Sequence, residues 1–277
     1  MKTRQYIILA MAATLLSSCV KDTLYNTPHP DKGAVTLSLA EGGNYVTDID
    51  GRTADVDGTP FTHPDLLEPG THSLLVYNRA EGFSFDGRTA QVNAPDGASR
   101  ADGIGIIPLP GYLYTDCRQI DVAADDTLFV RPEPRQRVRD LYLELTITEG
   151  RPELIQTAEA TLSGVAGAFD MEAAQTTGQP LTTSFGFTRQ DDKLNAHLRL
   201  LGTLGTEQAL TVFIAFTDDG RTQHTEIDLT EALADFNNDM TTGYQVKGNL
   251  QTPIGMEEGT GGIIGWNDVT GGDIEAN

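Results

Sequence analysis

The chain has 277 residues and is strongly acidic, with 40 Asp and Glu against 19 Lys and Arg and a formal net charge of −21. Such a charge repels phosphate, which excludes nucleic acid as a partner and also an anionic lipid surface approached by charge alone. The length exceeds what one small β-sandwich needs and fits two domains of ordinary size.

The first 18 residues have the features of a signal peptide. Lys2 and Arg4 precede an apolar stretch, residues 6–16, that is too short to span a bilayer. Residues 16–19, Leu-Ser-Ser-Cys, resemble the lipobox of bacterial lipoproteins, in which the cysteine becomes the acylated first residue of the mature chain. Two or more acyl chains such as palmitate anchor a protein stably, so we expect an exported lipoprotein held through Cys19. An ordinary signal peptide followed by a chance cysteine is the alternative.

Residues 19–32 are polar and include Pro28 and Pro30, a composition that predicts a spacer between the lipid and the folded body. Lys21 and Asp22 partly resemble the signal that sends some lipoproteins to the outer face of the outer membrane. The expected location is therefore the outer membrane, at the cell surface.

A first β-sandwich is expected over residues 33–134. Val35, Leu37 and Leu39 alternate with less apolar residues, which is typical of a half-buried strand, and Asp50-Gly51 predicts a tight hairpin turn. The apolar run at 73–78 predicts a strand covered on both faces. Short strands with regular turn signals then favour an antiparallel sandwich or barrel, which ends near the prolines at 132 and 134.

A second sandwich is expected over residues 135–277. Its clearest strand, 138–148, alternates apolar and polar residues, and residues 210–217 are apolar enough to predict a central strand covered on both faces. Asp228 and Glu231 form a capping-box pattern that predicts one short helix over 229–236. An acidic, Gly-rich arm, residues 252–277, ends the chain.

Motifs for chemistry are missing from the sequence. The five histidines show no nucleophile-elbow context and no pair at i, i+4, and no glycine-rich phosphate loop precedes a helix. The aspartates around Asp50 invite a calcium interpretation, but the hairpin turn already explains them. We therefore expect no catalysis, no metal, no cofactor and no small-molecule substrate. Cys117 is expected to be a small buried or half-buried apolar residue in a strand, with a free reactive thiol as the alternative.

Taken together, several short segments resemble the fimbrillin-like family of type V pili, in particular its minor, anchoring subunits. The matching segments follow one another along most of the mature chain: residues 19–24, 26–36, 67–71, 76–78, 160–167, 199–202, 229–236 and 264–266.

The resemblance implies two tandem transthyretin-like β-sandwich domains, attachment to the outer membrane through Cys19, and assembly with other fimbrial subunits by donor-strand exchange. An extended segment of one subunit then satisfies the open sheet edge of another. The candidate residues for this exchange are Val35, Leu37, Leu39, Ile263, Ile264 and Trp266. An arm that serves only as the last strand of its own domain is the alternative.

Two further points follow from the resemblance. An arginine-specific protease removes the first strand in polymerising members, and Arg52 is the residue where this would occur, but an anchor keeps the strand that joins lipid to body. The sequence leaves open an anchor, shaft or tip position.

A competing function is a surface glycan-binding lipoprotein. It is disfavoured because there is one Trp and most Phe and Tyr lie in alternating strands.

Replacing Cys19 by Ser tests the lipid anchor. We expect the wild-type chain to incorporate radiolabelled palmitate and to sediment with membranes, whereas Cys19→Ser loses both properties because the acylated thiol is gone. Cys117→Ser is the matched control and should keep both. Equal membrane retention of Cys19→Ser and wild type would show that Cys19 does not anchor the protein.

Overall fold

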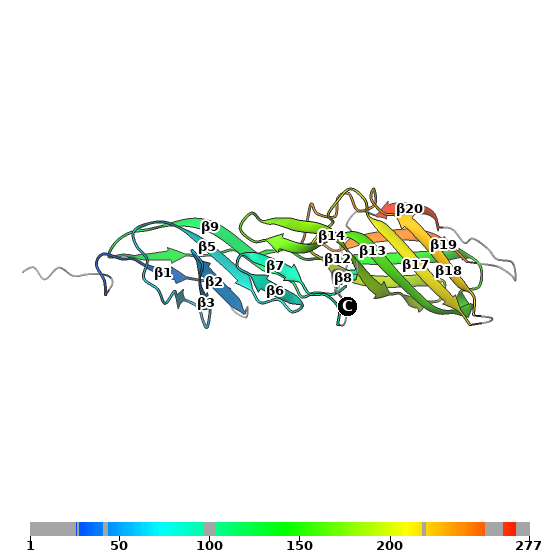
Figure 1. The fold of residues 1–277 in the computed structure, drawn as a ribbon, viewed down its shortest axis with the longest axis horizontal. Helices are drawn as coiled ribbons and strands as arrows, with labels where there is room; N and C mark the ends of the chain where they lie inside the picture. Colours follow the sequence, from blue (N-terminus) through cyan, green and yellow to red (C-terminus); the bar gives the residue numbers. More distant parts are fainter. Residues whose placement is uncertain are drawn as a thin grey trace, which may run out of the picture.

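The structure is a computed structural model that describes residues 26, 28–40, 44–96, 104–217, 220–252 and 263–269. These residues form an elongated molecule built almost entirely of β-strands, with two groups of strands arranged end to end (Figure 1). The predicted all-β sandwich class is confirmed. The signal peptide, Cys19, most of the spacer and most of the C-terminal arm lie outside the described residues. The described part contains no helix long and apolar enough to cross a membrane.

Two sheets form the N-terminal end of the molecule. The smaller sheet has the order β10-β1-β4, and the larger one has the order β11-β9-β5-β2-β3. Most neighbours are antiparallel, but β1 and β10 pair in parallel. The strands are β1 (Ala34–Leu37), β2 (Tyr45–Ile49), β3 (Arg52–Asp55), β4 (Phe61–Thr62), β5 (Gly70–Asn78), β9 (Tyr114–Val122), β10 (Thr127–Val130) and β11 (Arg135–Gln136).

The central strand β5 is buried on both faces, as the sequence predicts. Leu74 and Val76 enter a core shared with β1, whereas Leu75 and Tyr77 enter a second core that continues through the C-terminal strands. All four side chains are at most 7% exposed. The larger sheet therefore lies between two hydrophobic cores.

Two further sheets form the C-terminal end. One has the order β15-β16-β12-β19-β20, in which β12 and β19 are parallel. The other has the order β18-β17-β13-β14-β8, with the β6-β7 hairpin added through β13. The elements are β6 (Phe83–Asp86), β7 (Thr89–Val92), β8 (Ile104–Ile106), β12 (Arg139–Glu149), the 3-10 turn η3 (Pro152–Leu154), β13 (Ile155–Asp170), β14 (Gln175–Gly186), β15 (Thr188–Gln190), β16 (Lys193–Leu200), β17 (Ala209–Phe216), β18 (Thr222–Asp228), β19 (Tyr244–Gln251) and β20 (Ile263–Val269).

Strands β13 and β14 reach beyond their own sandwich and connect the two ends of the molecule. Ala168 to Asp170 of β13 pair with β7, and Thr182 and Thr183 of β14 pair with β8. Irregular register interrupts β13 near Gly164, whose φ of +70° and close approach to the Glu207 carbonyl leave no room for a side chain. Backbone pairing therefore crosses residue 134, and the domain boundary placed there stays a prediction.

The helix expected over 229–236 is a run of turns, so this detail of the prediction was wrong. Leu229, Leu233 and Phe236 are fully buried as expected, but the backbone bonds are a mixture of i+3 and i+4 contacts. The buried side chain of Arg139 contacts the end of this segment. Its guanidinium donates to the carbonyls of Asp235, Phe236 and Thr242 and lies 4.7 Å from the centre of the Tyr244 ring.

Strand β17 also departs from its prediction. It lies inside its sheet, but only one face is covered: Leu210, Val212 and Ile214 are buried, whereas Phe213 is 47% exposed. A run of apolar residues is compatible with burial on one or both faces, and here the second layer covers one face only.

Replacing Arg139 by Met tests the role of this side chain. Three backbone carbonyls would lose a charged donor in a site where Arg139 is 5% exposed. We expect the free energy of unfolding to fall by about 2–4 kcal/mol, measured by urea denaturation. Arg151→Met, at a side chain that is 57% exposed, is the control and should change it by less than about 0.5 kcal/mol. Equal effects of the two substitutions would contradict this role.

Candidate functional site

The N-terminal candidates for strand exchange lie in or just after β1. Val35 and Leu37 have 0% exposure and Leu39 has 7%, and all three belong to the core next to β5. Their strand is paired on both sides, with β10 in parallel and β4 antiparallel. The chain's own strand therefore fills this position in the sheet.

The C-terminal candidates lie in β20, which is the outermost strand of the sheet β15-β16-β12-β19-β20. Ile263 pairs with Leu250 and Trp266 with Gly248, and Ile264 falls at the register shift between these pairs. Strand β20 thus completes the chain's own sheet. The structure does not bring the two sets of candidates together, because β1 and β20 belong to opposite ends of the molecule (Figure 1).

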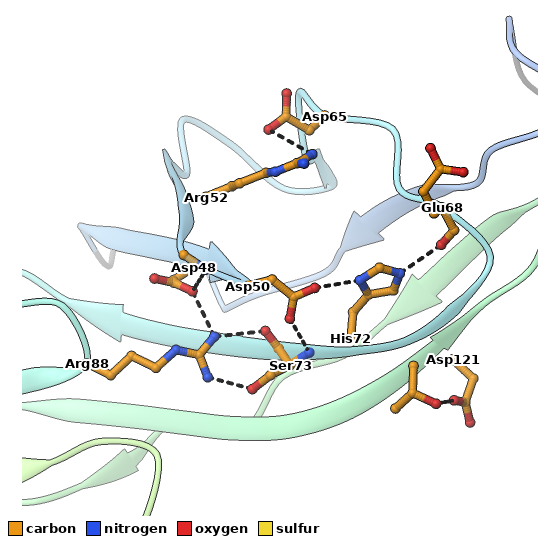
Figure 2. Close-up of polar contacts among 11 residues, drawn as sticks. Asp48, Asp50, Arg52, Asp65, Glu68, His72, Ser73, Arg88 and Asp121 are labelled. Atoms are coloured by element: carbon orange, nitrogen blue, oxygen red, sulfur yellow. Dashed lines mark hydrogen bonds and ion pairs between the residues drawn. The ribbon is translucent and has the colours of Figure 1, made fainter.

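A network of polar contacts among ionisable residues lies on the larger N-terminal sheet (Figure 2). Arg88, which precedes β7, donates to Asp48 Oδ1 at 2.8 Å and to the Ser73 carbonyl at 2.9 Å. Burial disfavours the charge of Arg88, but the bond to Asp48 and the nearby negative charges of Asp48 and Glu172 together raise its pKa. The ion pair therefore joins the β6-β7 hairpin to β2 and β5.

Cys117 lies beside this network, with its Sγ 3.9 Å from both Ser73 Oγ and Arg88 Nη1. It is half-buried in β9, as expected. Burial raises the pKa of its thiol despite the nearby cation. A protonated thiol is a poor nucleophile, which argues against the reactive-thiol alternative.

His72 holds the predicted hairpin turn against β5 (Figure 2). Asp50 and Gly51 both have positive φ, of 51° and 84°, so the Asp50-Gly51 turn is confirmed. His72 bonds Asp50 Oδ2 at 2.6 Å through Nδ1 and the Glu68 carbonyl at 2.8 Å through Nε2. Both ring nitrogens face acceptors, so the protonated imidazole satisfies more bonds than the neutral one.

Of the four aspartates that invite a calcium interpretation, Asp48, Asp50, Asp55 and Asp57, the first three already have partners. Asp48 bonds Arg88, Asp50 bonds His72, and Asp55 lies 2.7 Å from Arg79. No group of three His, Cys, Asp or Glu side chains suited to a metal ion occurs among the described residues. These carboxylates serve contacts within the protein.

A second ionisable cluster lies on the face of β12 and β16. Asp140 accepts from Tyr112 Oη at 2.6 Å and lies 2.6 Å from His197 Nε2. Burial and the Asp140 carboxylate raise the pKa of Tyr112 to about 12. The cluster resembles part of a catalytic constellation, but its carboxylate is engaged by Tyr112, His197 and Arg199. Within the described part of the chain, no Ser, Thr or Cys side chain bonds the His197 ring. Its evident effect is to join the segment before β9 to the C-terminal sheet.

The pH dependence of stability tests the His72 pair. Burial disfavours the charged imidazole, but the bonds to Asp50 and Glu68 raise its pKa, whereas the Ser73 amide and His72 lower the pKa of Asp50. The His72 contribution is thus complete below its unfolded pKa of about 6.5 and is lost as pH rises through the higher folded value; the Asp50 contribution is lost only as pH falls below about 4.

We therefore expect His72→Gln to lower the free energy of unfolding by about 0.5–1 kcal/mol at pH 5, with a smaller loss at pH 8.5. Urea denaturation at both pH values measures this difference. His224→Gln is the control, since that ring contacts Phe213 and no carboxylate in the described part of the chain. A loss from His72→Gln that is equal at both pH values would show that the charged pair contributes nothing.

Comparisons with known proteins bear on the fold. No protein-family model matches the chain, and no curated protein sequence matches it. Several solved structures do match. A candidate adhesin from Bacteroides ovatus ATCC 8483 superposes with a TM-score of 0.63 at 14% identity, covering 87% of this chain and 96% of its own.

Two more solved structures share the arrangement. The fimbrial anchor protein Mfa2 from Porphyromonas gingivalis has a TM-score of 0.56 at 12% identity, covering 86% of this chain and 98% of its own. Another candidate adhesin from Bacteroides ovatus has a TM-score of 0.51 at 11% identity, covering 86% and 92%. The chain therefore has the fold of this fimbrial anchor protein and of these candidate adhesins, and its resemblance to fimbrillin-like proteins is confirmed at the level of the fold.

Proposed function

We propose that this chain is a lipid-anchored structural subunit of a surface fibre, an anchor or minor subunit of a type V fimbria. It is held in the outer membrane through Cys19 and joins other fimbrial subunits by β-strand exchange, without catalysis. The observation that carries this proposal is the fold shared with the fimbrial anchor protein Mfa2 over 86% of this chain and 98% of that one.

The N-terminal strand supports an anchor in preference to a polymerising link. Cleavage after Arg52, whose side chain is 60% exposed, would remove both β1 and β2. Those strands supply Val35 and Ile49, each with 0% exposure, and β2 lies inside its sheet between β5 and β3. Losing them would expose the core next to β5, so the proposed subunit keeps its first strand and with it the connection to the lipid.

The C-terminal sheet offers the edge for a neighbour. Strand β20 is paired with β19 on one side only within the described residues. Beneath it, β19 alternates buried and half-buried residues, among them Tyr244, Val246 and Leu250. A strand of another subunit can extend this sheet at β20 by main-chain hydrogen bonds.

A pair of prolines tests this edge. Trp266→Pro with Asn267→Pro removes two consecutive amide donors, which point to opposite sides of β20. We expect cells carrying this double variant to keep the protein in the membrane but to shed fibres into the medium, as measured by sedimentation and electron microscopy. Arg189→Pro with Gln190→Pro, in β15 at the opposite edge of the same sheet, is the matched control and should retain the fibres.

Fibres that stay attached to cells with the β20 double variant would exclude exchange at this edge. If the β15 and β20 variants shed fibres equally, the loss of fibre attachment would come from general damage to the sheet. The proposed position of the exchange would then be wrong.

A further inference from the structure

The outer face of the sheet β18-β17-β13-β14 carries an exposed aromatic side chain in an ordered cross-strand row. The register places His224, Phe213, Glu159 and Gly186 side by side on four adjacent strands. Phe213 is 47% exposed, and its ring centre lies 4.8 Å from that of His224. Because directly opposed residues project from the same face, the Phe213 ring stands between an imidazole and a carboxylate.

A hollow of about 370 Å³ lies next to Phe213 on this face, with Glu159, Thr161, Ser184 and Gly186 among its lining residues. Gly186 is exposed, and a Cβ built on it would meet nothing closer than the Ala158 carbonyl at 4.0 Å. The absence of a side chain at Gly186 therefore leaves the surface open beside the carboxylate of Glu159.

Polar groups with no partner surround the hollow. The neighbouring row consists of Ser184, Thr161, Thr211 and Glu226, aligned in register across the same four strands. Within the described residues no hydrogen bond or ion pair engages the side chains of Glu159, Thr161, Ser184 or Thr211. This face thus combines one apolar platform with several free donors and acceptors.

A second aromatic–histidine stack in the described residues has no such unpartnered polar groups beside it. Tyr142 stacks on His197 at 4.7 Å, but the carboxylates around that stack are engaged. Asp140 bonds Tyr112 and His197, and Glu144 lies 3.1 Å from Lys193. Of these two aromatic–histidine stacks in the described part of the chain, the one at Phe213 leaves its polar groups available to a ligand.

We propose that the Phe213 face binds an uncharged sugar ring of a surface polysaccharide. A sugar ring has an apolar C–H face that stacks on an aromatic ring and a rim of hydroxyls that bond carboxylates and side-chain hydroxyls, which are the groups present here. Glu159, Glu226 and the net charge of −21 oppose sialylated or sulfated sugars. The proposal goes beyond fibre attachment, since it gives the subunit a ligand of its own.

An apolar protein partner fits this face less well. Such an interface has a core of several apolar side chains, whereas the residues around Phe213 are carboxylates, hydroxyls, a glycine and an imidazole. A single aromatic ring among polar groups matches the size of one sugar ring.

The test is calorimetric titration of the full-length protein in a sugar-free detergent. The probes are cellohexaose, laminarihexaose, mannohexaose and N-acetylchitohexaose, with sialyllactose and a heparin hexasaccharide as charged comparators. We expect saturable binding of at least one neutral probe. Phe213→Ala should weaken it by about tenfold or more, Phe213→Trp should keep it, and Glu159→Ala should weaken it several-fold.

Phe129→Ala is the matched control because Phe129 is 76% exposed and does not line the hollow. It should leave the affinity unchanged, and equal melting temperatures for all variants will show that they fold. The proposal is overturned if no neutral probe binds, if binding survives Phe213→Ala, or if a charged comparator binds more tightly than every neutral probe. Loss of fibre attachment with Phe213→Ala, without sugar binding by the wild type, would overturn it in favour of a protein interface.

Discussion

The structure depends on the burial of one sheet from both sides. Leu74 and Val76 of β5 pack toward β1, while Leu75 and Tyr77 pack into the core that also contains Leu141, Leu143 and other residues of the C-terminal strands. Each buried side chain of this size contributes roughly 1.5–3 kcal/mol relative to exposure. The two ends are therefore joined by a shared core and not by a bare linker, and β13 and β14 add backbone pairing across the same junction.

Several of the few basic residues bond groups on elements that are distant in sequence. The chain has 19 Lys and Arg for 40 acidic residues, and several arginines are engaged within the body. Arg88 joins the β6-β7 hairpin to Asp48 and Ser73, and Arg139 bonds the carbonyls of the turns that cover the C-terminal core. Placed between strands far apart in sequence, these cations fix the contacts that alternating apolar residues alone do not specify. The exposed surface keeps the excess negative charge, which favours solubility.

Local patterns in the sequence predicted much of this architecture. Alternation predicted the inward face of β12, the apolar run at 73–78 predicted a strand buried twice, and Asp50-Gly51 predicted its turn. The predictions failed for the segment after Asp228 and did not include the pairings between strands that are distant in sequence. A capping box predicted a helix after Asp228, but the segment forms turns with a mixture of i+3 and i+4 backbone bonds. The parallel pairs and the β7–β13 pairing are long-range and leave no local signal.

Some candidate site residues were also named from the sequence, whereas others were missed. Cys19 and the strand-exchange residues were named through resemblance, whereas Phe213 was missed because an apolar run does not show which face lacks a covering layer. Its neighbours Thr211 and Ala215, less apolar than the alternate residues, were the one available sign of an open face. That open face and the β20 edge belong to different sheets of the C-terminal sandwich. A sugar on the first and a neighbouring strand on the second would use separate surfaces, so the proposed fibre subunit would be able to bind a sugar while it contacts its neighbour.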